Sequence, residues 1–503
     1  MTLSLEQLSS RMRRGEDIPL RETAQVVLAL SVPSILQQMV VTAMEYIDAA
    51  MVGHIGAEAT AAIGIVSSST WLLHGILVGL YTAFSIQIAQ YLGADRQADA
   101  RGVLRQAMLF NLILGLAAAG FGIGISRFLP GWLGADLTLQ ANASAYFAIW
   151  SAALPFTMAM GMYAAMLRAT GDALTPGLIS VLVCGLDVVF NFFLINPTRT
   201  LALFGTRVTV WGAGLGVPGA ALGTALSNVI GGLLALAILL LRDGPLCIRK
   251  PGSWKITRAC LLNLWRVGAP LAAERAALSS AQVVLVRIVS GLGTVAIAAN
   301  SLGVSAEGLC YMAGYGIQDA AIALIGQAVG ANRKDMAKRF AWLCTGIGIG
   351  IMALSGMGLW VFAPALMGIF TADAAVIALG ARVLRIEAFA EPMFGASIVA
   401  SGAMQGAGDS TACFVLNLVS MWGIRLTLAS FFAPRFGLAG VWGSMCCELC
   451  IRGLLFLFRL ARGKWLEKGA LTWRRPSPAL LRNAGEGLFL FYFLPCRMGD
   501  SGL

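Results

Sequence analysis

Apolar residues in this chain gather into twelve long stretches that are separated by short polar segments. Each stretch holds about twenty residues or more, which is enough for a helix to cross a hydrocarbon core of roughly 30 Å. Residues 231–241, GGLLALAILLL, are apolar on every face, so they lack the alternation typical of a membrane β-strand. The pattern predicts spanning helices at residues 24–50, 59–89, 102–126, 139–167, 174–196, 216–241, 262–290, 295–327, 338–369, 374–404, 411–433 and 438–460.

The second half of the chain repeats the first at a constant offset of 237 residues. A period this long indicates two copies of a whole lobe, because solenoids and propellers repeat every 20 to 50 residues. Six spans in each copy return the second copy in the same orientation as the first. We therefore expect an all-α integral membrane protein whose twelve transmembrane helices form two pseudosymmetric six-helix bundles, as parallel repeats. Matching positions include Pro33 and Pro270, Pro155 and Pro392, and Gly171 and Gly408.

The lysines and arginines predict how the chain is oriented in the membrane. Twenty-six of the 36 fall in loops and tails on one side, and four fall on the other. Because positive charges favour the cytoplasm, both termini are expected to be cytoplasmic. The predicted order is a cytoplasmic tail at 1–22, a six-helix lobe at 23–241, a cytoplasmic linker at 242–261, a second six-helix lobe at 262–460 and a basic cytoplasmic tail at 461–503.

Composition supports a membrane protein and excludes several other classes. Hydrophobic residues make up 58% of the chain and charged residues only 12%, against about 25% in soluble domains. The net charge of +11 follows from topology, so no nucleic-acid partner is expected. The ten cysteines are scattered, and the C-x-x-C of Cys447 and Cys450 lies inside the last span, so neither a disulfide framework nor a metal site is predicted.

Acidic residues inside spans are the candidates for chemistry, because a carboxylate at bilayer depth normally faces a cavity or an ion pathway. Asp48 is prominent among them, since no Lys or Arg occurs between residues 22 and 95. It is expected to titrate, with Glu45 one turn earlier on the same face; capping of a helix end is the alternative. The acids within spans are Glu45, Asp48, Asp187, Glu274, Glu307, Asp319, Glu387, Glu391 and Glu448.

Two pairs of short motifs identify a family. IQIAQYLGADR at 86–96 is matched by ALIGQAVGANR at 323–333, and LRATGDALTP at 167–176 by MQGAGDSTAC at 404–413. Glycine beside charge at each position also suits a tight turn at a helix end. Over about residues 25–460 the chain resembles the multidrug and toxic compound extrusion (MATE) family, whose paired motifs occupy these places.

The resemblance implies a function and a site. Asp48 resembles the acid of the family's first helix, which implies a role in cation coupling together with Glu45, and Thr224 matches a position that supplies a hydroxyl. Asp187 and Asn191 form an i, i+4 pair in the fifth span, although family members often place the amide first and the acid second. Gln38, within the first span, is a further polar candidate on the first helix.

The second lobe offers its own candidates. Glu387 and Glu391 stand one turn apart before Pro392, and Glu274 follows Pro270 by one turn; family members that couple to sodium use acids in the corresponding helices. The alternative is structural pairing of Glu274 with Arg275 or Arg287 and of Glu387 with Arg382 or Arg385. Tyr163, among methionines of the fourth span, is a candidate for an adaptable substrate cavity, with simple packing as the alternative.

We therefore expect a monomeric, multi-pass exporter of the plasma (inner) membrane, without an organic cofactor. It would exchange external H⁺ or Na⁺ for a small, cationic, amphipathic compound as its two lobes rock in the lipid bilayer. One alternative is a lipid-linked glycan flippase of the same superfamily. A channel or a membrane-embedded enzyme is the alternative from another class, but no nucleophile or nucleotide-binding motif supports an enzyme, and the duplication argues against a simple channel.

Overall fold

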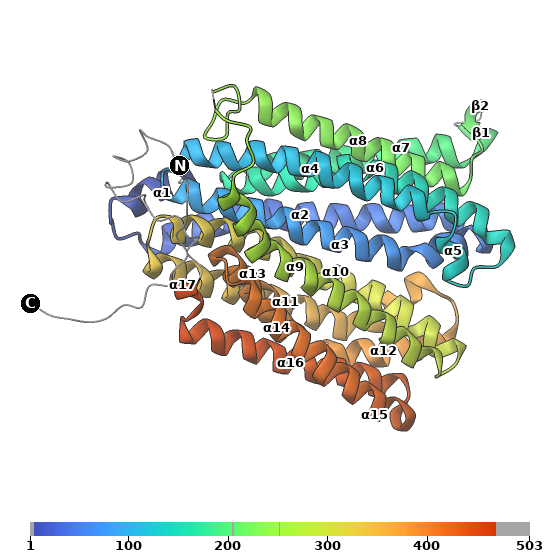
Figure 1. Ribbon diagram of the computed structural model, residues 1–503. Coiled ribbons are helices and arrows are strands. Elements are labelled where there is room, and N and C mark those ends of the chain that lie inside the picture. The colour runs from blue at the N-terminus through green and yellow to red at the C-terminus, as the bar shows by residue number, and fades with distance from the viewer. Residues whose placement is uncertain (1–4, 204–205, 251, 469–503) are drawn as a thin grey trace, which may run out of the picture.

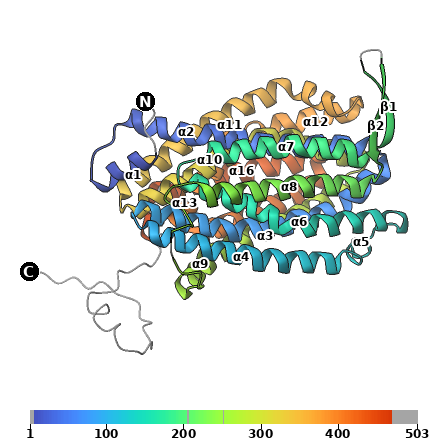
Figure 2. The ribbon, with the colours of Figure 1, turned by 90° about the horizontal axis from the view of Figure 1, so that it is seen from above.

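Nearly every described element of the chain is a helix, and the long helices run side by side (Figure 1; Figure 2). The computed structural model describes residues 5–203, 206–250 and 252–468. We call one end of the bundle the α1 end, after the short helix α1 (Leu5–Arg13). The opposite end, the hairpin end, carries the antiparallel strands β1 (Pro197–Leu203) and β2 (Thr206–Ala213) (Figure 1).

The first lobe consists of six long helices, and its fourth helix, α6, packs against α3, α4 and α8. A short helix, α5 (Leu129–Trp132), precedes α6. The six helices are α2 (Leu20–Gly53), α3 (Ala57–Gly93), α4 (Gln97–Ile125), α6 (Leu137–Ala169), α7 (Leu174–Ile195) and α8 (Val217–Leu241).

The second lobe has the same order of helices, but two of its spans are divided. The fourth span comprises α12 (Ala374–Glu387) and α13 (Glu391–Ala407), and the fifth comprises α14 (Ser410–Leu418), the π-helical segment η1 (Val419–Arg425) and α15 (Leu426–Phe436). The others are α9 (Arg258–Ser290), α10 (Thr294–Gly330), α11 (Lys334–Phe370) and α16 (Leu438–Arg462), and the short α17 (Trp465–Lys468) follows.

Three features differ from the pattern predicted by the sequence. The span expected at 374–404 is interrupted at residues 388–390, because Pro392 has no N–H to continue the helical ladder. The span expected at 411–433 contains the π-helical turn η1. A β-hairpin follows α7, where alternating β-branched residues suit paired strands. Residues 469–503 of the predicted tail lie outside the described residues.

Ten described helices are long and apolar enough to cross a membrane by themselves. The two remaining spans are α9, which carries Glu274, Arg275 and Arg287, and the divided span of α12 and α13. Charged residues within spans and breaks in the helices thus occur mainly in the second lobe. Discontinuous helices in transporters commonly surround ion and substrate sites, so this lobe has the irregular backbone expected near such a site.

The two lobes touch backbone to backbone at the α1 end. A Cβ atom added to Gly93 on α3 would lie 2.7 Å from the carbonyl carbon of Gln327 on α10. In the repeat-related contact, a Cβ on Gly330 would lie 2.7 Å from the carbonyl carbon of Gln90. Helix α1 covers this crossing, where the Ser9 hydroxyl donates to the Gln327 side chain. These contacts close the space between the lobes at the α1 end.

A second pair of crossings lies further along the same helices. A Cβ on Gly79 of α3 would lie 2.6 Å from the backbone nitrogen of Ala272 on α9. A Cβ on Gly316 of α10, the repeat counterpart of Gly79, would lie 2.5 Å from the Cα of Ile35 on α2. Small residues permit such close approach between membrane helices. The contacts between the lobes therefore follow the same twofold pattern as the sequence repeat.

Candidate ion-coupling site

Polar side chains from three helices meet inside the first lobe. The Asn191 amide donates from Nδ2 to Asp48 Oδ1 at 2.8 Å and to Asp187 Oδ2 at 3.0 Å. The Thr224 hydroxyl donates to Asp48 Oδ2 at 3.5 Å, and the Ser227 hydroxyl donates to Asp187 Oδ1 at 3.3 Å. We call these five residues the N-lobe polar cluster. The structure thus brings together four of the predicted site residues, namely Asp48, Asp187, Asn191 and Thr224.

Local sequence explains how this cluster forms. Asp187 and Asn191 are four residues apart on α7, so both side chains lie on one helical face. The facing helix α8 approaches closely because Gly223 has no side chain: a Cβ there would lie 2.9 Å from the Asn191 side-chain carbon Cγ. Ser227 follows Thr224 by three residues and shares its face. Glycine therefore determines the distance between α7 and α8, and the helical period determines which polar groups meet.

The cluster contains two carboxylates and no cation. Asp187 and Asn191 have no exposed surface, and no Lys or Arg of the described part of the chain forms an ion pair with Asp48 or Asp187. Two like charges bridged by one amide repel each other unless a proton or a small cation is shared between them. The Asn191 Oδ1 atom has no hydrogen-bond partner among the described residues, so one further acceptor is available there.

The two hydroxyl groups of the cluster have a second acceptor each. Thr224 Oγ1 lies 3.2 Å from the Ala220 carbonyl, and Ser227 Oγ lies 2.9 Å from the Thr224 carbonyl. A hydroxyl has one proton to donate, so it bonds either to the carboxylate or to its own helix. Both hydroxyls can thus release the carboxylates without losing a hydrogen bond, as binding and release of an ion would require.

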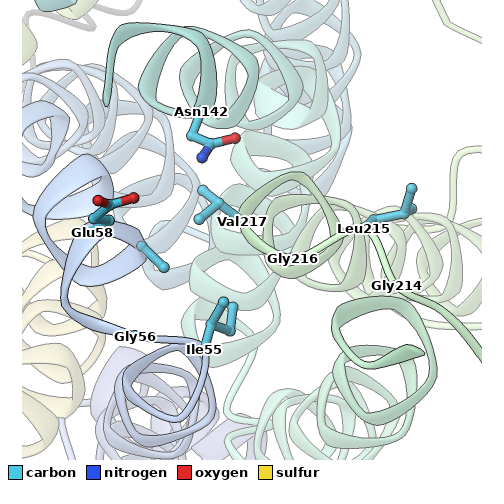
Figure 3. Close-up of a pocket in the computed structure, with 9 residues that line it drawn as sticks. Ile55, Gly56, Glu58, Asn142, Gly214, Leu215, Gly216 and Val217 are labelled. Atoms are coloured by element: carbon cyan, nitrogen blue, oxygen red, sulfur yellow. The ribbon is translucent and has the colours of Figure 1, made fainter. Parts of the chain in front are cut away.

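A pocket of about 400 Å³ lies at the hairpin end of the first lobe (Figure 3). The Glu58 and Asn142 side chains belong to different helices that border it. Ile55, just beyond the end of α2, follows Asp48 by seven residues, and Val217 precedes Thr224 by seven residues on α8, so the cluster lies about 10 Å further inside. An apolar layer stands between the two. Its buried members are Val52, Ala59, Ile195, Val217 and Ala220.

Three other predicted residues lie elsewhere in the lobe. Glu45 has an exposed side chain, and no hydrogen bond among the described residues joins it to Asp48. Gln38 donates from Nε2 to Asp319 of the second lobe at 3.3 Å. Tyr163 is 3% exposed and packs in an apolar core. Tyr146 of α6 lies near the cluster, since it interacts electrostatically with Asp48 and Asp187. Tyr163 follows Tyr146 by 17 residues, so it lies about 25 Å further along α6.

Two members of the site were not singled out from the sequence. Ser227 could have been found, because it follows Thr224 by three residues on one face of α8. Tyr146 of α6 is close enough to interact electrostatically with Asp48 and Asp187, and with Glu45. Nothing in the local sequence of Tyr146 indicates this, because its position depends on how α6 packs against the other helices.

The second lobe holds a larger acidic group, which we call the C-lobe glutamate cluster. Glu448 on α16 is fully buried and pairs with Arg425 at 3.1 Å and with Arg452 at 3.2 Å. Glu307 and Glu387 belong to the same electrostatic neighbourhood, as does Glu391. No side-chain oxygen of Glu387 or Glu391 has a hydrogen-bond partner among the described residues. The cluster comprises Glu307, Glu387, Glu391 and Glu448 with Arg425 and Arg452.

The ion pairs considered as an alternative for this lobe are not among the direct ion pairs of the described residues. Glu274 Oε1 accepts a hydrogen bond from Asn417 Nδ2 at 2.7 Å, and Arg275 interacts with Glu274 electrostatically. Arg385 donates to the Trp360 carbonyl at 3.3 Å. These partners were considered because they lie in the same span, but tertiary packing brings other groups closer.

Comparison with known proteins gives a consistent picture. The sequence profile of the family described as MatE matches residues 33–193 and 270–431. A probable multidrug resistance protein NorM of Thermotoga maritima is 25% identical over 472 residues, which cover 92% of this chain and 96% of that protein. The protein of the same name from Pseudomonas aeruginosa is 28% identical over 475 residues, with 92% and 94% covered.

Solved structures confirm the fold. A crystal structure of a MATE protein in complex with MaL6 gives a TM-score of 0.81 at 22% identity, covering 92% of this chain and 99% of that one. An outward-facing multidrug resistance MATE family transporter of the MOP superfamily gives the same values. Such transporters have twelve helices in two repeats, as predicted here. The two matched ranges of the family profile begin at Pro33 and Pro270, the offset found within the sequence.

Proposed function

This chain belongs to the MatE family of multidrug and toxic compound extrusion transporters, and we propose that it exchanges an organic cation for H⁺ or Na⁺ through the N-lobe polar cluster. It is a multi-pass membrane transporter of small molecules and not an enzyme. The proposal concerns the coupling ion, the charge of the substrate and the mechanism of exchange. A monomer in the plasma membrane, with both termini in the cytoplasm, is part of the same proposal.

The observation that carries the proposal is the pair of carboxylates without a cation. Asp48 and Asp187 share one amide donor, and no Lys or Arg of the described chain neutralises them. Removing charges from water without compensation is costly, so the pair is stable only with a shared proton or a bound cation. Because two hydroxyls and one free amide oxygen surround the pair, both ions have suitable acceptors there. Ion binding is therefore the chemistry that this site favours most.

Exchange follows if lobe movement depends on the charge of this cluster. With the α1 end facing the cytoplasm, as the positive charges suggest, the conformation described here is closed to the cytoplasm. A proton or Na⁺ that enters from outside removes one of the two negative charges of the cluster, and its release inside restores that charge. Each unit charge moved inward across 100 mV contributes about 2.3 kcal/mol to the exchange.

The C-lobe glutamate cluster is proposed as a second ion site. Its four glutamates exceed its two arginines by two, and both arginines form their ion pairs with Glu448. Glu387 and Glu391 are the members without hydrogen-bond partners among the described residues, and they flank the break between α12 and α13. We assign coupling first to the N-lobe polar cluster, because no ion pair within it competes for the ion.

The test is Asp48→Asn, which keeps the size of the side chain but removes its charge. The variant and the wild type are reconstituted in liposomes, and efflux of a fluorescent cation is measured under separately imposed pH and sodium gradients. We expect the variant to insert normally and to lose gradient-driven efflux. Asp243→Asn, in the loop after α8 where the side chain is 92% exposed, is the matched control and should transport normally. Near-normal efflux by Asp48→Asn would reject the assignment and favour Glu387 and Glu391.

A further inference from the structure

One ion pair joins the two lobes within the bundle. Arg168, near the end of α6 in the first lobe, lies 3.2 Å from Asp319 Oδ2 on α10 in the second lobe. Both side chains are largely buried, at 11% and 24% exposed. Gln38 of α2 donates to the same carboxylate oxygen, and Arg168 Nη1 also donates to Gln37 Oε1 at 2.9 Å. Arg168 and Gln38 thus both bond to Asp319 from the opposite lobe.

The pair lies inward of the contacts that close the α1 end. Asp319 precedes Gly330 by eleven residues on α10, which corresponds to about 16 Å along the helix. It follows Gly316, where α10 crosses α2, by three residues. Asp319 is therefore separated from the α1 end by the crossing of Gly93 and Gly330. Separation of the lobes at that end would open a route to it.

The repeat shows that packing does not require these charges. At the offset of 237 residues, Arg168 corresponds to Gln405, and Asp319 corresponds to Thr82. The neighbouring crossings are nevertheless alike, since the contact of Gly79 with Ala272 repeats that of Gly316 with Ile35. Arg168 and Asp319 thus form an ion pair beside one crossing, whereas their counterparts at the other crossing are neutral and Arg275 of α9 occupies the place of Gln38 there. The pair of Arg168 and Asp319 is therefore not needed to bring the helices together.

Opening of the α1 end would affect the two charges differently. Arg168 would keep Gln37, because both belong to the first lobe. Asp319 would lose Arg168 and Gln38 together, and a carboxylate without a partner at this depth is unstable by several kcal/mol. We propose that Asp319 is the loading site for the cationic group of the substrate when the α1 end is open. This inference rests on the proposed function and names a binding residue for its substrate.

The surroundings of Asp319 suit an organic cation. Tyr81 of α3 is close enough to interact electrostatically with Arg168 and Asp319, and also with Arg275 of α9. Its ring would offer an aromatic face to an alkylated or aromatic ammonium group beside the carboxylate. When the α1 end closes, Arg168 returns to Asp319 and displaces the substrate's charge. Asp319 then binds the substrate's cationic group when the α1 end is open and Arg168 when it is closed, so its carboxylate has a positive partner in both conformations.

The decisive variants are Asp319→Asn and the double change Arg168→Gln with Asp319→Thr. The double variant introduces the neutral residues found at the other crossing, so it is expected to fold and to close. Ethidium, a permanent cation, is the probe, and its transport is measured in everted vesicles over a range of concentrations. We expect both variants to raise the KM for ethidium about tenfold or more, with kcat within about twofold of wild type. Asp319→Glu should restore most of the affinity.

The outcomes separate binding from a simple lock between the lobes. A fall in kcat with unchanged KM would show that the ion pair only holds the lobes together, and an unchanged KM and kcat would show that Asp319 does not bind substrate. Either result overturns the inference. The imposed pH and sodium gradients should still drive residual transport in these variants. If Asp48→Asn also keeps gradient-driven efflux, the coupling assignment fails, whatever the KM of the Asp319 variants.

Discussion

Gly93 offers a direct test of the contact that closes the α1 end. Gly93→Ala places a methyl group 2.7 Å from the carbonyl carbon and 2.8 Å from the Cα of Gln327, whereas ordinary contacts of a Cβ begin at 3.4 Å. The atoms that it meets are backbone, so no side chain can turn aside. The φ angle of Gly93 is not positive, and alanine can adopt it without strain. The Gln327 carbonyl oxygen lies closer still to the added methyl group. Helices α3 and α10 therefore have to separate by at least about 0.7 Å at this point, the difference between 3.4 and 2.7 Å for the carbonyl carbon.

The cost of this separation falls on one conformation. Overpacking of this kind costs about 1–3 kcal/mol, and the clash disappears once the lobes part. The gain of about 1 kcal/mol in helix propensity from Gly to Ala applies to both conformations and cancels. Since about 1.4 kcal/mol corresponds to a factor of ten, the closed population should fall by about 5-fold to 150-fold relative to the open one. The double variant with Gly330→Ala should shift it further.

Spin-label distances across the α1 end would measure this shift. Labels at Ala98 and Lys334, both exposed at the starts of α4 and α11, report the separation of the lobes in a background without reactive cysteines. We expect Gly93→Ala to add a longer distance or to increase its population. Gly102→Ala is the matched control, since no atom lies within 4 Å of the added methyl group. Equal distance distributions for Gly93→Ala and Gly102→Ala would refute the reasoning.

Two predictions concern stability. Glu448→Gln leaves two buried arginines without their carboxylate, so it should lower the free energy of unfolding by about 3–5 kcal/mol; melting of the purified protein should show this, and a melting temperature equal to that of the exposed-site variant Glu58→Gln would contradict it. Burial acts to raise the pKa of Asp172, but hydrogen bonds from Thr175 and Arg242 hold it below its ordinary value. Stability from this lowered pKa is present above the unfolded-state pKa of about 3.9 and is lost as the pH falls through the folded-state pKa. Asp172→Asn should therefore lower the melting temperature at neutral pH and lower it less near about pH 3; an equal loss at both pH values would oppose this.

Sequence reasoning located four of the five members of the N-lobe polar cluster, all but Ser227, because helical geometry constrains them. The spacing of Asp187 and Asn191 places both on one face of any helix. The lack of any Lys or Arg near Asp48 identified an acid without a local partner. The resemblance to the family added Thr224. Packing of the first lobe as a helical bundle brings α2, α7 and α8 together, and hydrogen bonds join the four residues in the structure.

The partners of other residues could not be predicted, because they depend on packing between distant segments. Gln38 bonds to Asp319, 281 residues later, across the contact between the lobes. Arg385 was considered as one alternative partner of Glu387, but the packing of α11 brings it to the Trp360 carbonyl. The hairpin after α7 was missed because the residues between two spans were treated as a simple loop. Spacing along one helix shows which residues share a face, but it does not show which residues of a neighbouring helix they contact.

The two lobes share a frame but differ in their charges. Ser227 and Glu448 are both the eleventh residue of the last long helix of their lobe. Ser227 donates to an acid that has no cation nearby, whereas Glu448 is held by two arginines. The same difference occurs between the lobes, where the ion pair of Arg168 and Asp319 corresponds to Gln405 and Thr82. The closing contacts of Gly93 and Gly330 are related by the repeat, so they belong to the helical frame that the two lobes share. We infer that the frame provides the movement of the lobes, and that the unequal charges decide which ion and which substrate the movement carries.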